Sequence, residues 1–145
     1  MDLDTLLNKN QKEAATYLDS HLRIIAGAGS GKTRVVTYRI AHLIQDVGID
    51  PRSILAITFT NKAANEMKER VNEVVGIHGS GTLICTIHSL CVRFLRQHIN
   101  VLNYPSNFTI MDEEDQKALI KKLYTQLEID AKLFLLKYDQ YNFFI

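Results

Sequence analysis

The sequence of 145 residues has no tryptophan, two prolines, two cysteines and a net charge of only +1. Two cysteines cannot build a disulfide framework, and they are most simply reduced core residues. No uninterrupted apolar run is long enough to span a bilayer. The acidic start, Met1 to Asp4, also lacks the basic and then apolar regions of a secretory signal. We therefore expect a cytoplasmic protein without a membrane partner.

The near-balance of charge excludes a long basic arm for nucleic acid. The part up to Pro105 has 12 basic and 9 acidic residues, and the rest has 5 and 7. If the chain binds DNA, a local patch and base stacking must hold the strand. With 46% apolar residues the chain can bury a core, and its length fits one domain, or one domain and part of another.

The run Ala26-Gly27-Ala28-Gly29-Ser30-Gly31-Lys32-Thr33 is the most informative segment. It follows an apolar stretch over 22–26 and precedes a helical pattern, which is the context of a phosphate-binding loop. Glycine lets backbone N–H groups approach phosphate oxygens. Lys32 can reach the β- and γ-phosphates, and the Thr33 hydroxyl can bind Mg²⁺. Ala26 stands where the strict pattern has glycine, and the alternative is a plain glycine turn before a helix.

Apolar periodicity predicts an alternation of strands and helices. Strands are expected over 22–26, 54–59 and 83–86, and helices over 8–18, from about Lys32, over 61–75 and over 89–99. This order indicates an α/β fold with a doubly wound parallel sheet. In such sheets ligands lie at the carboxyl ends of the strands. The phosphate loop, Thr58 to Asn61 and Thr86 to Ser89 should therefore share one rim.

The run Phe108-Thr109-Ile110-Met111-Asp112-Glu113 allows two interpretations. It is a candidate strand, and the acidic pair after it resembles a Walker B motif, in which Asp holds Mg²⁺ and Glu activates water. Thr109 interrupts the apolar run, however, and more acidic residues lead into an amphipathic helix that Asp112 can cap. We favour the helix cap, with Leu119, Ile120, Leu123 and Leu127 on the apolar face of the helix.

Cys85, His88 and Cys91 are spaced like part of a metal site. A structural zinc needs four ligands, and no fourth ligand stands at a suitable spacing. The three residues also span the expected junction of a strand and a helix. We therefore favour reduced thiols without zinc.

Four segments together resemble the UvrD/Rep-like DNA helicases of superfamily 1A. Leu7-Asn8-x-x-Gln11-x-x-Ala14 resembles the adenine-recognising Q motif, and Ala26 to Thr33 with Arg34 resembles motif I. Residues 57–67 are similar to motif Ia. Thr86-Ile87-His88-Ser89 is similar to motif Ib, with Ile87 where an aromatic residue is usual. Residues 108–116 resemble the passage into the helical 1B insertion, and the likeness covers roughly residues 6–130.

The resemblance implies a RecA-like P-loop NTPase fold, in which helices flank a parallel sheet that is incomplete here. Residues 1–105 would be the amino-terminal part of the ATP-binding domain 1A. Residues 106–145 would be the beginning of the helical 1B subdomain. From about Leu133 the chain departs from the family pattern.

The resemblance also implies two sets of binding residues. Gln11 would read the adenine edge, although it could be a solvated helix glutamine instead. Phe59 would stack on bases of single-stranded DNA, or else be the last core residue of its strand. For Thr86 and His88, phosphate contact competes with helix capping. The nucleotide set is Gln11, Ala26, Gly27, Ala28, Gly29, Ser30, Gly31, Lys32, Thr33 and Arg34, and the DNA set is Phe59, Thr60, Asn61, Thr86 and His88.

The implied activity is ATP- and Mg²⁺-dependent 3′-to-5′ translocation on single-stranded DNA, with unwinding of 3′-tailed duplexes. This chain would bind nucleotide but hydrolyse it very slowly, because it lacks a catalytic acid and the second RecA-like domain. A nucleotide-binding or regulatory module without nucleic-acid activity is the alternative. A third view is a folding unit without a function of its own. An incomplete parallel sheet would also expose an edge and favour self-association.

Overall fold

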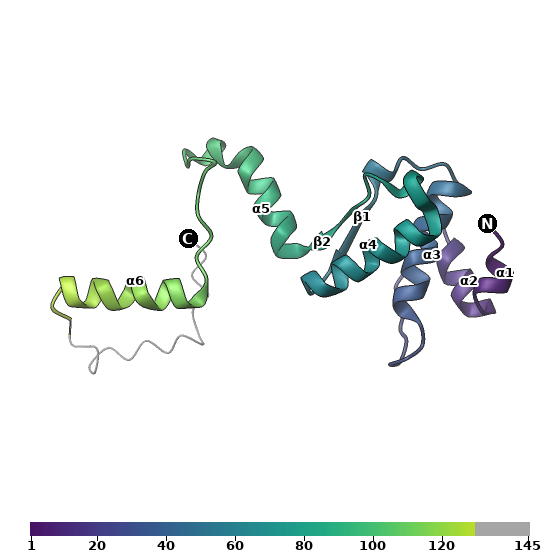
Figure 1. The fold of residues 1–145 in the computed structure, drawn as a ribbon, viewed down its shortest axis with the longest axis horizontal. Helices are drawn as coiled ribbons and strands as arrows, with labels where there is room; N and C mark the ends of the chain where they lie inside the picture. Colours follow the sequence, from purple (N-terminus) through teal and green to yellow (C-terminus); the bar gives the residue numbers. More distant parts are fainter. Residues whose placement is uncertain (130–145) are drawn as a thin grey trace. The chain divides into compact units, whose positions relative to one another are not determined.

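The computed structural model describes residues 1–129, and the expected departure from the family pattern after Leu133 lies outside them. The chain divides into two compact units, residues 1–99 and 100–145. The elements of the first unit in chain order are α1 (Leu3–Leu6), α2 (Lys9–Thr16), α3 (Lys32–Gln45), β1 (Leu55–Thr58), α4 (Asn61–Val75), β2 (Leu83–Thr86) and α5 (Ile87–His98) (Figure 1). Short 3-10 turns lie at Pro51–Ser53, Gly76–Gly79 and Ile99–Leu102.

Side chains fix where three of these helices begin. Asn8, Thr60 and Thr86 each accept a hydrogen bond through a side-chain oxygen from the backbone N–H three residues later. Such caps satisfy donors that the first turn of a helix leaves unpaired. The expected helices over 8–18, 61–75 and 89–99 are confirmed, with ends shifted by at most two residues.

The sheet of the first unit has two parallel strands within the described residues, connected through α4. Leu55 pairs with Leu83, and Thr58 pairs with Thr86. The two carboxyl ends are therefore level, and α4 and α5 begin from the same edge of the sheet. This arrangement confirms the predicted strands over 54–59 and 83–86 and the α/β class.

The strand predicted over 22–26 is wrong for this structure. These residues have no regular secondary structure, and Ile25 is 88% exposed. An apolar segment becomes a strand only when its N–H and C=O groups pair with a neighbour. Within residues 1–129, β1 and β2 pair with each other and no strand lies beside this segment. The candidate strand over 108–111 is wrong for the same reason.

Helix α3 connects two clusters of buried side chains. Ile40 and Ala41 pack with residues of α4 and of β2, whereas Val35 packs with residues of α1 and α2. Figure 1 shows α3 between α4 and the amino-terminal helices. Ile40 is buried, whereas Val47 lies beyond the end of the helix and is exposed. Since α3 starts directly after the phosphate loop, both clusters help to position that loop.

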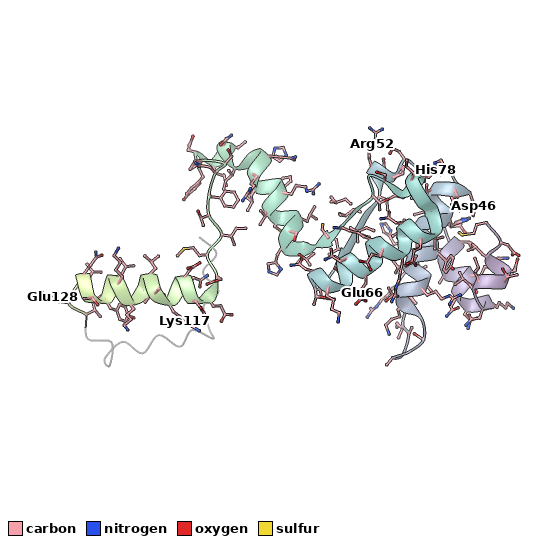
Figure 2. All side chains as sticks on the ribbon, viewed as in Figure 1. Asp46, Arg52, Glu66, His78, Lys117 and Glu128 are labelled. Carbon is pink, nitrogen blue, oxygen red and sulfur yellow. The ribbon has the colours of Figure 1, made fainter. Side chains whose placement is uncertain are left out.

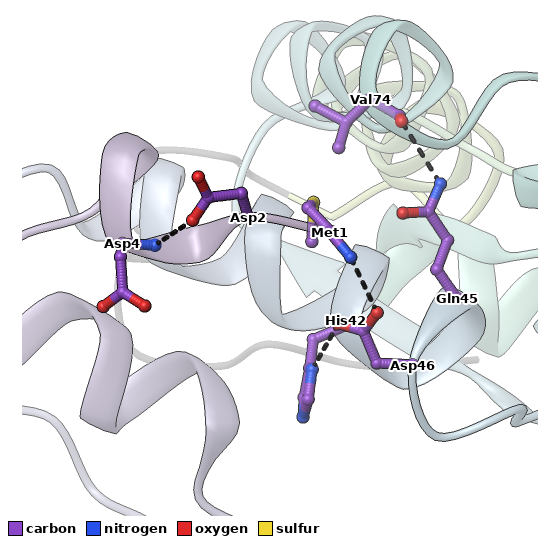
Figure 3. A network of polar contacts seen from close by, with 7 residues as sticks. All are labelled: Met1, Asp2, Asp4, His42, Gln45, Asp46 and Val74. Atoms are coloured by element: carbon purple, nitrogen blue, oxygen red, sulfur yellow. Dashed lines mark hydrogen bonds and ion pairs between the residues drawn. The ribbon is translucent and has the colours of Figure 1, made fainter.

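Polar contacts hold the far end of α3 (Figure 3). The amino group of Met1 donates to Asp46 Oδ1 at 3.0 Å, and His42 Nδ1 lies 2.8 Å from Asp46 Oδ2. Gln45 Nε2 donates to the carbonyl oxygen of Val74 at 3.4 Å. The hydrogen bonds from His42 and from the Met1 amino group hold the pKa of the Asp46 carboxyl below its ordinary value of 3.8. These contacts join α3 to the start of the chain and to α4.

The described part of the second unit contains α6 (Glu113–Gln126). Asp112 Oδ1 accepts a hydrogen bond from the N–H of Asp115 at 2.8 Å, and Asp115 Oδ2 accepts one from the N–H of Asp112. This reciprocal cap confirms the predicted role of Asp112 as the start of a helix. None of the helices in residues 1–129 has the length and apolarity needed to cross a bilayer.

Candidate nucleotide and nucleic-acid site

The phosphate loop has the backbone that its glycines predict. Gly29 has φ +74° and Gly31 has φ +84°, a region that side-chain-bearing residues avoid. Both the N–H and the hydroxyl of Ser30 donate to the Gly27 carbonyl, at 3.4 Å and 2.8 Å. Lys32 is the first residue of α3. The loop therefore ends at a helix N-terminus, where the helix dipole favours an anion.

Lys32 folds back over the loop that precedes it. Its ammonium donates to the carbonyl oxygens of Ala26 at 3.1 Å and Gly27 at 2.7 Å. The charge thus already lies at the loop, where charge-assisted hydrogen bonds to phosphate would be stronger than bonds to neutral carbonyls. Thr33 follows Lys32 in the first turn of α3 and is exposed.

Gln11 is bonded at both ends of its amide. Oε1 accepts from the N–H of Asn8 at 3.1 Å, and Nε2 donates to the Ser30 carbonyl at 2.9 Å. Gln11 is half-buried, unlike a solvated helix glutamine. Its bond to Ser30 joins α2 to the phosphate loop. An amide has two donors and two acceptor lone pairs, so one donor and one acceptor position are left for a base edge.

Gly31 explains how Gln11 comes so close to the loop. A Cβ at this position would lie 2.8 Å from Gln11 Nε2, closer than a Cβ atom normally approaches another heavy atom. The left-handed φ favours glycine here, and a Cβ would also force the end of the Gln11 side chain away from its present position.

An open hollow of about 570 Å³ lies between the amino-terminal segment and the phosphate loop. Arg34 supports its wall through two hydrogen bonds to the Leu6 carbonyl, at 2.8 Å and 3.1 Å, and lies 5.6 Å from the Tyr38 ring centre. The volume is typical of small-molecule sites. The lining residues are Thr5, Leu6, Leu7, Asn8, Gln11, Gly29, Ser30, Gly31 and Arg34.

Sequence reasoning missed how α3 holds the amino-terminal helices. Arg39 Nη1 donates to the carbonyl oxygens of Tyr17 at 2.6 Å and Ala14 at 3.2 Å, at the end of α2. Together with Arg34 it fixes the wall that carries Gln11. The two arginines lie five residues apart on α3, which is a signal too weak to be read without the position of α2.

The residues predicted to bind DNA gather at the carboxyl ends of β1 and β2. Phe59 is 100% exposed, so it is not the last core residue of its strand. Thr60 caps α4, and the hydroxyl of Thr58 donates to the Thr60 carbonyl at 3.0 Å. Asn61 is the first residue of α4 and is exposed. An exposed aromatic ring beside a helix N-terminus suits a base and its phosphate.

Thr86 and His88 differ in their surroundings. Thr86 is 4% exposed, and its hydroxyl accepts from the Ser89 N–H at 3.2 Å and lies 2.9 Å from the Ser89 hydroxyl. The structure thus gives Thr86 the capping role, whereas His88 is exposed in the first turn of α5. Thr58 and Thr86 are register partners in the sheet. The start of α5 therefore lies beside the end of β1, which Phe59 follows.

The other candidate metal residues do not gather. Cys85 is half-buried and Cys91 is exposed. Within residues 1–129 no three His, Cys, Asp or Glu side chains come together as metal ligands. Asp112 serves as a helix cap rather than at the end of a strand, which disfavours the Walker B interpretation.

Comparisons with known proteins show the family of this chain. The family model described as the UvrD/REP helicase N-terminal domain matches residues 7–143. The chain is similar to the ATP-dependent DNA helicase PcrA of Staphylococcus aureus (strain Mu50), with 48% identity over 128 residues, which is 88% of this chain and 18% of that protein. PcrA of Staphylococcus epidermidis (strain RP62A) gives the same identity and coverage. The chain thus spans about 18% of the length of these relatives.

Proposed function

Because this chain belongs to the UvrD/REP helicase N-terminal domain family, we propose that it is the ATP-binding portion of an ATP-dependent DNA helicase. In this proposal residues 1–105 form the amino-terminal part of a RecA-like domain 1A, and residues 106–145 begin the helical subdomain 1B. The parent protein couples ATP hydrolysis to 3′-to-5′ movement on single-stranded DNA and unwinds 3′-tailed duplexes.

The observation that supports the nucleotide part is that Gln11 and Lys32 both bond to the same loop. Gln11 contacts Ser30, and Lys32 contacts Ala26 and Gly27. Adenine would occupy the hollow beside Gln11, and the triphosphate would lie along the N–H groups from Gly29 to Lys32. Thr33 would supply an oxygen ligand to Mg²⁺, which neutralises charge on the β- and γ-phosphates.

The exposed ring of Phe59 carries the DNA part of the proposal. Stacking on an aromatic ring is worth about 1–3 kcal/mol per base and works for every base, as translocation requires. Thr60, Asn61 and His88 would contact the phosphate backbone beside the ring, and Thr86 would hold the start of α5 in place for them. The chain on its own would bind ATP and single strands without rapid turnover, because stabilisation of the transferred phosphoryl group also needs a catalytic acid and arginines from elsewhere.

Titration of the chain with a fluorescent ATP analogue and Mg²⁺ tests the nucleotide part. Lys32→Ala should weaken binding roughly 10- to 100-fold, since a charge-assisted hydrogen bond is removed. Lys68→Ala removes the same charge from the exposed side of α4 and should leave the affinity unchanged. Equal effects of the two variants would contradict the proposed phosphate site.

A labelled single-stranded oligonucleotide tests the DNA part by fluorescence anisotropy. Phe59→Ala should weaken binding about fivefold or more, because one stacking platform is removed. Lys32-dependent nucleotide binding without any oligonucleotide binding at low salt would favour a nucleotide-binding module without nucleic-acid activity.

A further inference from the structure

One long segment of this chain contains no acidic residue. All 16 aspartates and glutamates lie outside residues 74–111, and this segment holds Arg93, Arg96 and three of the five histidines. The chain as a whole is nearly neutral, so this segment is basic because the acidic residues lie elsewhere in the sequence and not because basic residues are in excess. A segment without carboxylates adds no repulsion of its own against a phosphate backbone.

The central element of this segment is α5, most of whose residues are exposed. None of its residues is buried, and side chains project from every side of it (Figure 2). Ser89, Arg93, Arg96 and Gln97 are spaced by four, three and one residues, so they lie on one side of the helix. The other side carries apolar residues and the two histidines of α5, and there the ring of Phe94 lies 4.7 Å from that of His98.

The polar side of α5 starts at the edge of the sheet where the proposed DNA contacts lie. Thr86 caps α5 and is the register partner of Thr58, the residue before Phe59. Neighbouring strands lie about 4.8 Å apart, so the first turns of α4 and α5 begin side by side. A DNA strand whose bases stack on Phe59 would therefore lie close to the start of α5.

We propose that the polar side of α5, through Arg93, Arg96 and Gln97, binds the phosphate backbone of single-stranded DNA and extends the contact made at Phe59 and His88. This proposal rests on the proposed function, because it assumes that the strand is held at the end of β1. Guanidinium groups suit the role, since their planar donors match phosphate oxygens and remain charged at all relevant pH values. Gln97 adds a neutral amide donor on the same side of the helix.

The test measures the affinity of the chain for a fluorescein-labelled oligothymidine over a series of salt concentrations. The double variant Arg93→Gln/Arg96→Gln should bind about 5- to 20-fold more weakly at low salt. Its plot of log affinity against log salt should be less steep by about 0.7 for each phosphate that the variant no longer neutralises. The matched control Lys121→Gln/Lys122→Gln removes two exposed charges from α6 and should change neither quantity.

Nucleotide binding separates the failure of this proposal from the failure of the function. The α5 variant should keep the affinity of the chain for the ATP analogue and its helical circular dichroism. If Phe59→Ala weakens oligonucleotide binding and the α5 variant does not, the proposal is wrong while the function stands. Equal losses in the α5 variant and its α6 control would also overturn it, since net charge alone would then explain the effect. If the unaltered chain binds no oligonucleotide, both the DNA part of the function and this proposal are wrong.

Discussion

At the scale of single residues, Gly31 combines a left-handed backbone with a close approach of the Gln11 side chain. It holds φ at +84°, and its missing Cβ leaves room for Gln11 Nε2. We predict that Gly31→Ala lowers the free energy of unfolding by about 2 kcal/mol, against about 1 kcal/mol for Gly29→Ala, where only the φ is strained. Urea denaturation of both variants checks this, because nothing lies within 4 Å of a Cβ at Gly29. Equal losses would mean that Gln11 does not approach the loop in solution.

Gln11 has two functions that substitution can separate. Its Oε1 caps α2 through Asn8, and its Nε2 holds the Ser30 carbonyl. We predict that Gln11→Glu keeps the cap, since glutamate is equally suited to that position, but weakens binding of the ATP analogue because the donor to Ser30 is removed. Gln11→Ala should weaken nucleotide binding as well and also cost about 0.5–1 kcal/mol of stability. If Gln11→Glu binds nucleotide as well as the unaltered chain, the contact with Ser30 has no part in the site.

Asp46 gives the stability of the first unit a pH dependence. Its folded-state pKa is lowered by hydrogen bonds from His42 and from the Met1 amino group. A lowered pKa means that the carboxylate stabilises the fold above the unfolded-state pKa and that this stabilisation is lost as the pH falls through the folded-state pKa. We predict that Asp46→Asn destabilises the chain at pH 7 by less than about 1 kcal/mol, as expected for an exposed ion pair. Thermal unfolding of both proteins should show the difference shrinking below about pH 4, the range set by the unfolded carboxyl.

At the scale of elements, α6 decides between the two interpretations of Asp112. As a helix cap, Asp112 can be replaced by asparagine, which accepts the same hydrogen bond without the charge. We predict that Asp112→Asn leaves Mg²⁺-dependent nucleotide binding unchanged, whereas Asp112→Ala lowers the helical content or stability of α6 by about 1 kcal/mol. Nucleotide titration and circular dichroism check the two effects separately. A large loss of nucleotide binding in Asp112→Asn would restore the Walker B interpretation.

The elements that the sequence predicted well are those whose stability is local. Helices α4 and α5 carry their own caps, and the apolar face of α4 shows plainly in its spacing. The segment over 22–26 has an equally clear apolar pattern, yet a strand depends on a neighbour that the pattern does not name. The same holds for the site. The glycine loop could be predicted from composition and spacing. The hydrogen bond from Gln11 to Ser30 could not, because it joins residues 19 positions apart that only the folded chain brings together.

At the scale of the whole molecule, the sheet of the first unit leaves apolar side chains in water. Leu55 is 49% exposed and Ile57 is 47% exposed, while Ala56 between them packs toward the core. Parallel sheets are normally covered on both faces, and an uncovered strand edge can pair with another chain. The exposed face of β1 therefore favours association between copies of this chain.

We predict that the chain associates as its concentration rises, and that Leu55→Thr/Ile57→Thr reduces this association. Threonine keeps the branched Cβ that strands favour, so the substitution removes apolar surface without removing strand propensity. Light scattering on a gel-filtration column, over a series of loading concentrations, measures the average mass. Leu119→Thr/Leu123→Thr is the matched control, because it removes two similarly exposed apolar side chains from α6 in the second unit. A chain that stays monomeric at every concentration would show that the bare face of β1 is tolerated in water, and an equal effect of the control would place the association elsewhere.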